Sequence, residues 1–313
     1  MKAIIVKEFG SPEVMKIEEV SMPNVEASQV LVKVKAVGVN PVDAYIRSGV
    51  YPSVPKLPYT CGKDAAGIVE QIGENITKVK VGDRVYTADS ISGTYAEYVV
   101  CKENQVNLLP ENISFEQGAG VFVPYATSYR ALFQKANAKS GETVLIHGAS
   151  GGVGIAAIQW AKNAGLKVIG TASSAKGLEL IKQQGCDVVL DHSQPDYLKG
   201  IEAEIILEML ANVNLVKDFD ALKKFGRIVV IGNRGSIEFN PRLTMGKDAT
   251  IYGMSLFNFS DDDEAEIQRE IYKGLSKGYL NPIVGKIFPL ANAPQAHTEV
   301  IESKAFGKIV LIP

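Results

Sequence analysis

The sequence predicts an α/β protein with two parts, a β-rich domain and a doubly wound parallel sheet of six strands. Residues 1–110 consist of short segments in which apolar and polar residues alternate, which is typical of antiparallel strands. Residues 143–254 instead contain apolar runs separated by helix-like segments, which is typical of parallel βαβ units. With 313 residues, 46% of them hydrophobic, the chain is long enough for two hydrophobic cores.

The two ends of the chain share the strand-like pattern. Alternation is clearest in QVLVKVKAVGV (29–39) and YAEYVV (95–100), and proline and glycine separate such segments. The last stretches, GKIFPL (285–290) and GKIVLIP (307–313), return to the same pattern. We therefore expect the C-terminal strands to rejoin the N-terminal domain.

The middle of the chain alternates between helices and strands. SFEQGAGVFVPYATSYRALFQKA (114–136) predicts a helical stretch. Apolar runs then follow in the number expected for a doubly wound parallel sheet. These six runs lie at 143–147, 168–171, 187–190, 204–208, 227–231 and 250–254.

One more helix is predicted at SDDDEAEIQREIYKGLSKG (260–278). Ser260 and Asp263 have the spacing of a capping box. Ile267, Ile271 and Leu275 follow at intervals of four residues and form one apolar face. The acidic run is interpreted as a helix N-terminus, because carboxylates in a first turn stabilise the helix dipole.

The stretch HGASGGVG (147–154) joins the first of the six strands to a helix-like segment. Gly148, Gly151 and Gly154 are spaced three apart, with Gly152 between them. This is not the strict G-x-G-x-x-G pattern, and a tight strand-to-helix turn without a ligand would also need glycine. Its place as the first turn of a six-strand unit favours a site where a dinucleotide pyrophosphate rests on the helix N-terminus.

The end of the second strand favours NADPH over NADH as the cofactor. NAD-specific folds place an acidic residue there to bind the ribose 2′-hydroxyl. This chain has ASSAKG (172–177), so Ser173, Ser174 and Lys176 offer donors and a cation for a 2′-phosphate, while the nearest acid, Glu179, lies a turn further on. One of the two serines is also expected to cap the following helix.

Composition and charge exclude several classes of protein. The formal net charge of -2 and the pI near 6.0 give no footprint for nucleic acid, so RNA and DNA are not expected as the main partner. No window approaches the roughly 18 apolar residues of a membrane span, and no signal sequence is evident at the N-terminus. We expect a cytoplasmic protein.

Cysteine and histidine usage argues against a metal site. Cys61, Cys101 and Cys186 have no C-x-x-C spacing, so neither a disulfide framework nor a structural zinc site is expected. The three histidines, at positions 147, 192 and 297, are scattered and are interpreted as surface or packing residues. Chemistry without a metal is therefore favoured.

These residues together resemble the zinc-independent medium-chain dehydrogenase/reductase family, and within it the quinone oxidoreductase group and its zeta-crystallin branch. Zinc-dependent relatives carry G-H-E where this chain has Gly62-Lys63-Asp64, and they add a four-cysteine loop that this chain lacks. The resemblance extends over essentially the whole length. It rests on GVNPVDAYIRSGVY (38–51), ISGTYAEY (91–98), VPYATSYRAL (123–132), HGASGGVG (147–154), EMLANVNL (208–215) and GNRGSIEFNPR (232–242).

The resemblance implies a domain organisation and a set of site residues. A GroES-like catalytic domain would comprise 1–120 and 260–313, and a Rossmann domain that binds NADPH would comprise 121–259. Catalytic roles would fall to Tyr51 and Asn40. Cofactor contacts are implied for Thr127 at the nicotinamide, for Ser150, Gly151, Gly152 and Val153 at the pyrophosphate, for Ser173, Lys176 and His192 at the adenosine phosphate, and for Asn214, Ile231, Gly232, Asn233 and Arg234 along the cofactor wall. Two residues depart from the family pattern, Ser173 where glycine is usual and Cys61 where proline is frequent.

The reaction that the resemblance implies is metal-independent reduction of a quinone by NADPH. A donor near the quinone oxygen would stabilise the charge that develops there, and Tyr51 or Asn40 could serve; Tyr51 could equally be a lid over the cofactor. Reduction of an enone or 2-alkenal double bond is an alternative on the same fold. Zeta-crystallin relatives also suggest two non-enzymatic alternatives, binding of AU-rich RNA and a structural role as a crystallin.

Relatives of this kind form homodimers or homotetramers. We expect subunits to pair along the strand ATIYGMSLF (249–257), which the strand order places at the edge of the parallel sheet. Neither the identity of the quinone or enone nor the choice between hydride and one-electron transfer follows from the residues.

Overall fold

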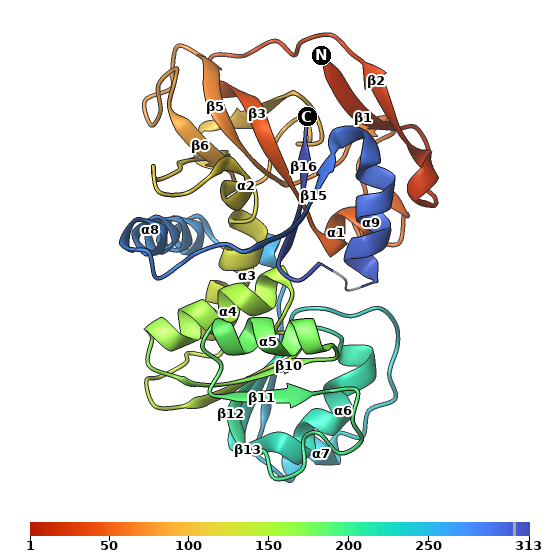
Figure 1. The fold of residues 1–313 in the computed structure, drawn as a ribbon, viewed down its shortest axis with the longest axis vertical. Coiled ribbons are helices and arrows are strands. Elements are labelled where there is room, and N and C mark those ends of the chain that lie inside the picture. The colour runs from red at the N-terminus through yellow and green to blue at the C-terminus, as the bar shows by residue number, and fades with distance from the viewer. Residues whose placement is uncertain (303–304) are drawn as a thin grey trace. The chain divides into compact units, whose positions relative to one another are not determined.

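The computed structural model describes residues 1–302 and 305–313 (Figure 1). Contacts within the chain divide it into two compact units. The first unit combines Met1–Val123 with Tyr272–Pro313, and the second unit is Pro124–Ile271. Each unit builds its own sheets and its own hydrophobic core.

A seven-stranded sheet forms the centre of the first unit. All its pairs are antiparallel except β15 with β16, and the pairing of Ile309 with Val39 places the last strand beside β3. This confirms that the C-terminal strands rejoin the N-terminal part of the chain. The strands are β3 (Gln29–Val39), β5 (Asp64–Ile72), β6 (Arg84–Thr87), β7 (Tyr98–Lys102), β8 (Val106–Leu108), β15 (Val284–Pro289) and β16 (Lys308–Ile312).

Alternation along β3 fixes which face of that sheet is buried. Val32 and Val34 are buried, whereas Lys33 and Lys35 are exposed. A Cβ on Gly38 would lie 1.9 Å from the carbonyl oxygen of Ala119, so only glycine fits there. A smaller sheet and short helices complete the unit: β1 (Lys2–Val6), β2 (Met15–Glu19), β4 (Tyr59–Thr60), α1 (Pro41–Arg47), α2 (Phe115–Gly118), α9 (Ala293–Ile301) and 3-10 turns at Pro12–Val14, Glu103–Gln105 and Leu290–Asn292.

The second unit contains the predicted six-stranded sheet. All its pairs are parallel, in the order β11-β10-β9-β12-β13-β14, which is the doubly wound order with β9 as the first strand. Figure 1 shows α4 and α5 over one face and α6 over the other. The elements are β9 (Thr143–Ile146), α4 (Gly152–Asn163), β10 (Lys167–Ala172), α5 (Ala175–Gln183), β11 (Val188–Asp191), β12 (Ala203–Glu208), α6 (Ala211–Ala221), β13 (Leu222–Val230), α7 (Arg242–Met245), β14 (Thr250–Gly253) and a 3-10 turn at Leu256–Asn258.

The predicted helical stretch at 114–136 is helical but irregular. After α2 it continues as a π-helical segment at Phe122–Ala126, α3 (Thr127–Tyr129) and a second π-helical segment at Arg130–Lys135. Pro124 has no amide hydrogen, which interrupts the regular α-helical bonding. The Ser128 hydroxyl donates a hydrogen bond to the Pro124 carbonyl at 2.8 Å.

Helix α8 (Asp261–Lys277) has the predicted start and the predicted buried face. Asp263 N donates to Ser260 Oγ at 3.1 Å, and Ser260 N donates to Asp263 Oδ2 at 3.3 Å, which is a capping box. Ile267, Ile271 and Leu275 are fully buried. No helix in the described part of the chain is both long enough and apolar enough to cross a membrane.

Replacing Ser260 with alanine tests the cap. Ser260→Ala removes the acceptor for the Asp263 amide and should lower the free energy of unfolding by about 1 kcal/mol. Ser276→Ala is the matched control, because Ser276 is exposed near the other end of the same helix. Urea titration of both variants measures the difference, and equal losses would contradict the assignment.

Candidate functional site

The glycine turn follows β9 directly and leads into α4. Gly148 has φ of +56°, a conformation that favours glycine, and a Cβ on Gly154 would lie 2.5 Å from Ala149 Cα. Gly151 is the N-cap of α4, and no side chain caps this helix. A Cβ on Gly151 would meet only the Gly148 oxygen, at 3.5 Å. The turn itself therefore explains Gly148 and Gly154, whereas Gly151 leaves first-turn N–H groups available to an anion.

The residues expected at the pyrophosphate form this helix start. Ser150, Gly151, Gly152 and Val153 are all half-buried, so their backbone can be reached from solvent. From Gly154 to Ala161 the helix is buried. The arrangement suits a ligand with a negative charge at the carboxyl end of β9.

The predicted phosphate-side residues follow the ends of β10 and β11. Ser174 caps α5, because its hydroxyl accepts a hydrogen bond from Gly177 N at 3.2 Å. Ser173 and Lys176 are exposed beside it. His192 Nδ1 lies 3.1 Å from the Thr171 hydroxyl, which orients the ring at the same edge of the sheet. The structure thus assigns the capping role to Ser174.

The predicted cofactor wall follows β12 and β13 and converges on Glu208. Asn214 Nδ2 donates to Glu208 Oε1 at 3.2 Å. The Glu208 carbonyl accepts from Ile231 N at 2.9 Å and from Gly232 N at 3.2 Å. A Cβ on Gly232 would lie 2.2 Å from the Met209 carbonyl oxygen, so only glycine allows the two loops to approach this closely.

The last two wall residues are held by local hydrogen bonds. Arg234 N donates to Asn212 Oδ1 at 2.9 Å, which ties the loop after β13 to the start of α6. Asn233 Nδ2 donates to the Gly235 carbonyl at 2.6 Å. The residues expected to line the cofactor on this side therefore belong to one hydrogen-bonded pair of loops.

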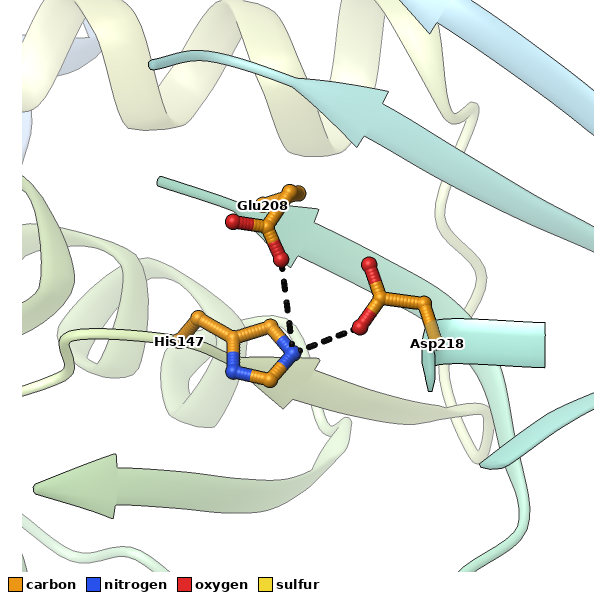
Figure 2. A group of neighbouring side chains, drawn as sticks. All are labelled: His147, Glu208 and Asp218. Carbon is orange, nitrogen blue, oxygen red and sulfur yellow. Dashed lines mark hydrogen bonds and ion pairs between the residues drawn. The ribbon is translucent and has the colours of Figure 1, made fainter. Parts of the chain in front are cut away.

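A buried polar group that the sequence did not predict lies beneath these loops (Figure 2). His147 Nε2 is 2.8 Å from Asp218 Oδ1 and 3.5 Å from Glu208 Oε2, and all three side chains are buried. Their ligand-type atoms lie within 4.8 Å of one another. The 2.8 Å contact is a hydrogen bond, so we interpret the group as a proton-holding cluster.

Burial is the largest cause of the pKa shifts in this group. It raises the pKa of Glu208 to about 7, and the neighbouring charge of Asp218 contributes to that rise. Burial likewise raises the pKa of Asp218 to about 7, and it lowers the pKa of His147. The cluster therefore retains a proton on its carboxyl groups up to near neutral pH.

In the first unit, Asn40 lies in a buried network with Asp64 and Lys308. Lys308 Nζ donates to Asn40 Oδ1 at 2.6 Å and to Asp64 Oδ2 at 2.7 Å. Asn40 Nδ2 donates to Asp64 Oδ2 at 3.0 Å. Asn40 is only 3% exposed, so a substrate atom would have to lie directly against its amide to form a hydrogen bond with it.

A second buried network in this unit starts at Asp43. Its Oδ2 accepts from Asn40 N at 2.9 Å and from the Tyr95 hydroxyl at 3.3 Å, and burial raises its pKa to about 7. The Tyr95 hydroxyl also lies 3.0 Å from His297 Nε2, and burial lowers the pKa of His297 to about 3. His297 is therefore a neutral packing residue, as predicted.

A cavity of about 780 Å³ opens beside this network. Asp43, Tyr59, Cys61 and Val54 are among the residues that line it, whereas Asn40 and Tyr51 are not. Burial raises the pKa of Cys61 to about 12, so its thiol stays protonated and unreactive at neutral pH. Tyr51 is half-buried in the loop between α1 and β4.

Comparison with known proteins identifies the family. Residues 26–111 match the family described as "Alcohol dehydrogenase GroES-like domain", and residues 152–271 match "Zinc-binding dehydrogenase". A quinone oxidoreductase of Homo sapiens is 45% identical over 321 aligned residues, which cover 100% of this chain and 98% of that protein. The chain belongs to the quinone oxidoreductase family. Quinone oxidoreductase 1 of Escherichia coli is 31% identical over 97% of each chain.

Solved structures of this family share the fold. The structure of Escherichia coli quinone oxidoreductase complexed with NADPH has a TM-score of 0.91 and 30% identity, and the match covers 100% of both chains. A quinone oxidoreductase of Pseudomonas syringae pv. Tomato DC3000 has a TM-score of 0.91 and 31% identity, covering 100% of this chain and 99% of that one. The GroES-like domain and the Rossmann-like sheet are therefore those of quinone oxidoreductases.

Two residues of the Gly62-Lys63-Asp64 stretch form ion pairs. Lys63 Nζ forms an ion pair with Asp89 at 2.9 Å. Asp64 forms one with Lys308 at 2.7 Å, and both of those side chains are buried. The carboxylate of Asp64 thus has an internal cation as its partner.

Sequence reasoning missed Glu208, Asp218, Asp64 and Lys308. Asp218 is 71 residues from His147, and Lys308 is 244 residues from Asp64, so no local spacing links them. The available signal was polarity at buried positions: Glu208 ends an apolar strand, and Lys308 begins one.

The glycine turn can be tested by two substitutions of the same kind. Gly154→Ala should cost about 3 kcal/mol of stability, because its Cβ collides with backbone atoms of Ala149. Gly151→Ala should leave stability nearly unchanged, since φ is -84° and the Cβ has room. Thermal and urea unfolding of both variants would check this, and a stable Gly154→Ala protein would refute the packing argument.

Proposed function

We propose that this chain is an NADPH-dependent quinone reductase that works without a metal. The observation that carries the proposal is the 45% identity to the human quinone oxidoreductase over 100% of this chain. An NADPH complex of the Escherichia coli enzyme, which has a TM-score of 0.91, supports the choice of cofactor.

The second unit offers a fitting place for NADPH. The uncapped start of α4, Ser150 to Val153, would receive the pyrophosphate, and Ser173, Lys176 and His192 would receive the 2′-phosphate side. No acid follows β10 directly in the sequence. We assign Thr127, Asn214 and the 231–234 loop (Ile231, Gly232, Asn233, Arg234) to the remainder of the cofactor. When bound, NADPH supplies the reducing electrons.

Tyr51 and Asn40 are the proposed catalytic residues. Negative charge develops on a quinone oxygen during reduction, and a nearby hydrogen-bond donor lowers the energy of that state. The Asn40 Nδ2 group donates one hydrogen to Asp64, and we assign its second hydrogen to the quinone oxygen. Lys308 accounts for the amide oxygen and so fixes which way the amide faces.

The function is tested by following NADPH oxidation with 9,10-phenanthrenequinone, 1,4-benzoquinone and 3-nonen-2-one in parallel. Turnover of the quinones supports the proposal. Turnover of the enone alone would instead make the protein an enone or 2-alkenal reductase. NADPH binding without any turnover would favour a binding or structural role, and a salt-dependent gel-shift assay with AU-rich RNA would test the RNA alternative.

The proposed 2′-phosphate site predicts a cofactor-specific effect. Lys176→Ala should raise the KM for NADPH roughly tenfold, because one phosphate contact is lost, and should leave the KM for NADH unchanged. Lys182→Ala is the control, since Lys182 is exposed on the same helix, α5. A similar change for both cofactors would contradict a 2′-phosphate contact.

Metal independence is tested by chelation. Because Lys308 supplies the cation beside Asp64, dialysis against EDTA should leave quinone turnover and the melting temperature unchanged. Elemental analysis of the purified protein provides the second readout. Activity that falls on dialysis and returns with zinc would overturn this part of the proposal.

The remaining assignments concern organisation. We propose a catalytic domain of 1–120 with 260–313, a cofactor domain of 121–259, and a cytoplasmic location. We also propose a homodimer or homotetramer that pairs along β14, because β14 is an edge strand of its sheet. Light scattering coupled to size-exclusion chromatography would measure the assembly, and a monomer would contradict it.

A further inference from the structure

The buried cluster of His147, Glu208 and Asp218 connects three segments assigned to the cofactor. His147 is the residue before Gly148 in the glycine turn. Glu208 Oε1 accepts from Asn214 Nδ2 at 3.2 Å and also from Leu210 N. The Glu208 carbonyl accepts from Ile231 N at 2.9 Å and from Gly232 N. One residue thus bonds to the start of α6 and to the loop after β13, and it lies beside the glycine turn.

This convergence follows from the strand order. β9 and β12 are neighbours in the sheet, and Leu207 pairs with Ile146, so Glu208 and His147 leave the sheet side by side. Between these two strands the strand order reverses, which is where doubly wound sheets bind their ligands. Any movement of the Glu208 side chain would therefore shift the segments assigned to the cofactor.

We propose that Glu208 is a positioning residue for NADPH, held in place by His147 and Asp218, and that the proton on this cluster sets the affinity for NADPH. The inference rests on the cofactor part of the proposed function. Glu208 acts through Asn214 and the 231–234 loop and needs no contact with NADPH of its own.

Two buried carboxyl groups face a single imidazole nitrogen, Nε2, which can donate only one hydrogen. Glu208 Oε2 and Asp218 Oδ2 are buried and have no hydrogen-bond partner. A proton shared by the two carboxyl groups satisfies them and removes one of the two negative charges.

Loss of that proton leaves an extra negative charge beneath an anionic ligand. The titratable groups that face the cluster from neighbouring segments are Tyr197, whose ring lies 6.3 Å from His147, and His192, which stacks edge-on to Tyr197. Burial raises the pKa of Tyr197 to about 12 and lowers that of His192, so both are neutral from pH 7 to 9. Neither compensates the new charge.

The raised pKa of Glu208 gives the direction in which NADPH affinity changes with pH. The folded-state pKa of Glu208, about 7, lies above its ordinary value of 4.5, so its contribution to stability is complete below pH 4.5 and is lost as pH rises through 7. NADPH affinity should likewise weaken as the pH rises through 7. The 2′-phosphate, with a pKa of about 6, is already ionised above pH 7 and does not confuse the reading.

Glu208→Gln carries the decisive test. Glutamine keeps the acceptor for Leu210 and Asn214, and its amide donates to Asp218 as a protonated carboxyl would. The Kd for NADPH, measured by fluorescence without any quinone, should rise several-fold from pH 7 to 9 in the wild type and stay flat in Glu208→Gln. Glu202→Gln is the control, because Glu202 is exposed at the opposite end of β12, and it should behave as the wild type.

Glu208→Ala supplies the second arm. Loss of the acceptor should raise the Kd and KM for NADPH at least about tenfold at pH 7, the effect of one charge-assisted hydrogen bond, with a smaller change in kcat. Should this variant fail to fold, the Glu208→Gln profile decides alone. A Glu208→Gln profile as steep as the wild type, or a folded Glu208→Ala protein with wild-type Kd, overturns the proposal. Absence of NADPH binding by the wild type would instead refute the proposed function.

Discussion

The adjacency of β9 and β12 is the constraint on which the cofactor platform depends. The loops that follow parallel strands all lie at one edge of the sheet. The adjacency of β9 and β12 therefore brings together the glycine turn, the start of α6 and the loop after β13. Glycine at 154 and 232 allows neighbouring backbone segments to come into contact, because a Cβ would not fit there. Glu208 accepts hydrogen bonds from N–H groups of the start of α6 and of the loop after β13. The glycine turn, the start of α6 and the loop after β13 thus meet because of one topological arrangement.

In the first unit, a buried lysine is the partner of a buried carboxylate and a buried amide. Asp64 and Asn40 are both buried, and Lys308 bonds to both at under 3 Å. Lys308 begins β16, which reaches Asn40 only because that strand pairs with β3. The return of the C-terminus to the N-terminal sheet therefore places the charge that orients Asn40.

Sequence reasoning recovered what local patterns encode. All six parallel strands, the glycine turn, the Ser260 cap and the return of the C-terminal strand were predictable, because each depends on periodicity or on a short motif. The irregular helix around Pro124 was predicted only as helical. Glu208 with His147, and Asp64 with Lys308, could not be predicted, because strand order alone brings these residues together.

We propose that NADPH rests on the edge of the second unit's sheet where β9 and β12 end. Hydrogen–deuterium exchange with and without NADPH tests it most directly. With NADPH bound we expect slower exchange at the amides of 151–154 and 231–234 and no change at 139–142, which precede β9 at the opposite edge. Unchanged exchange at both cofactor segments under saturating NADPH would contradict it.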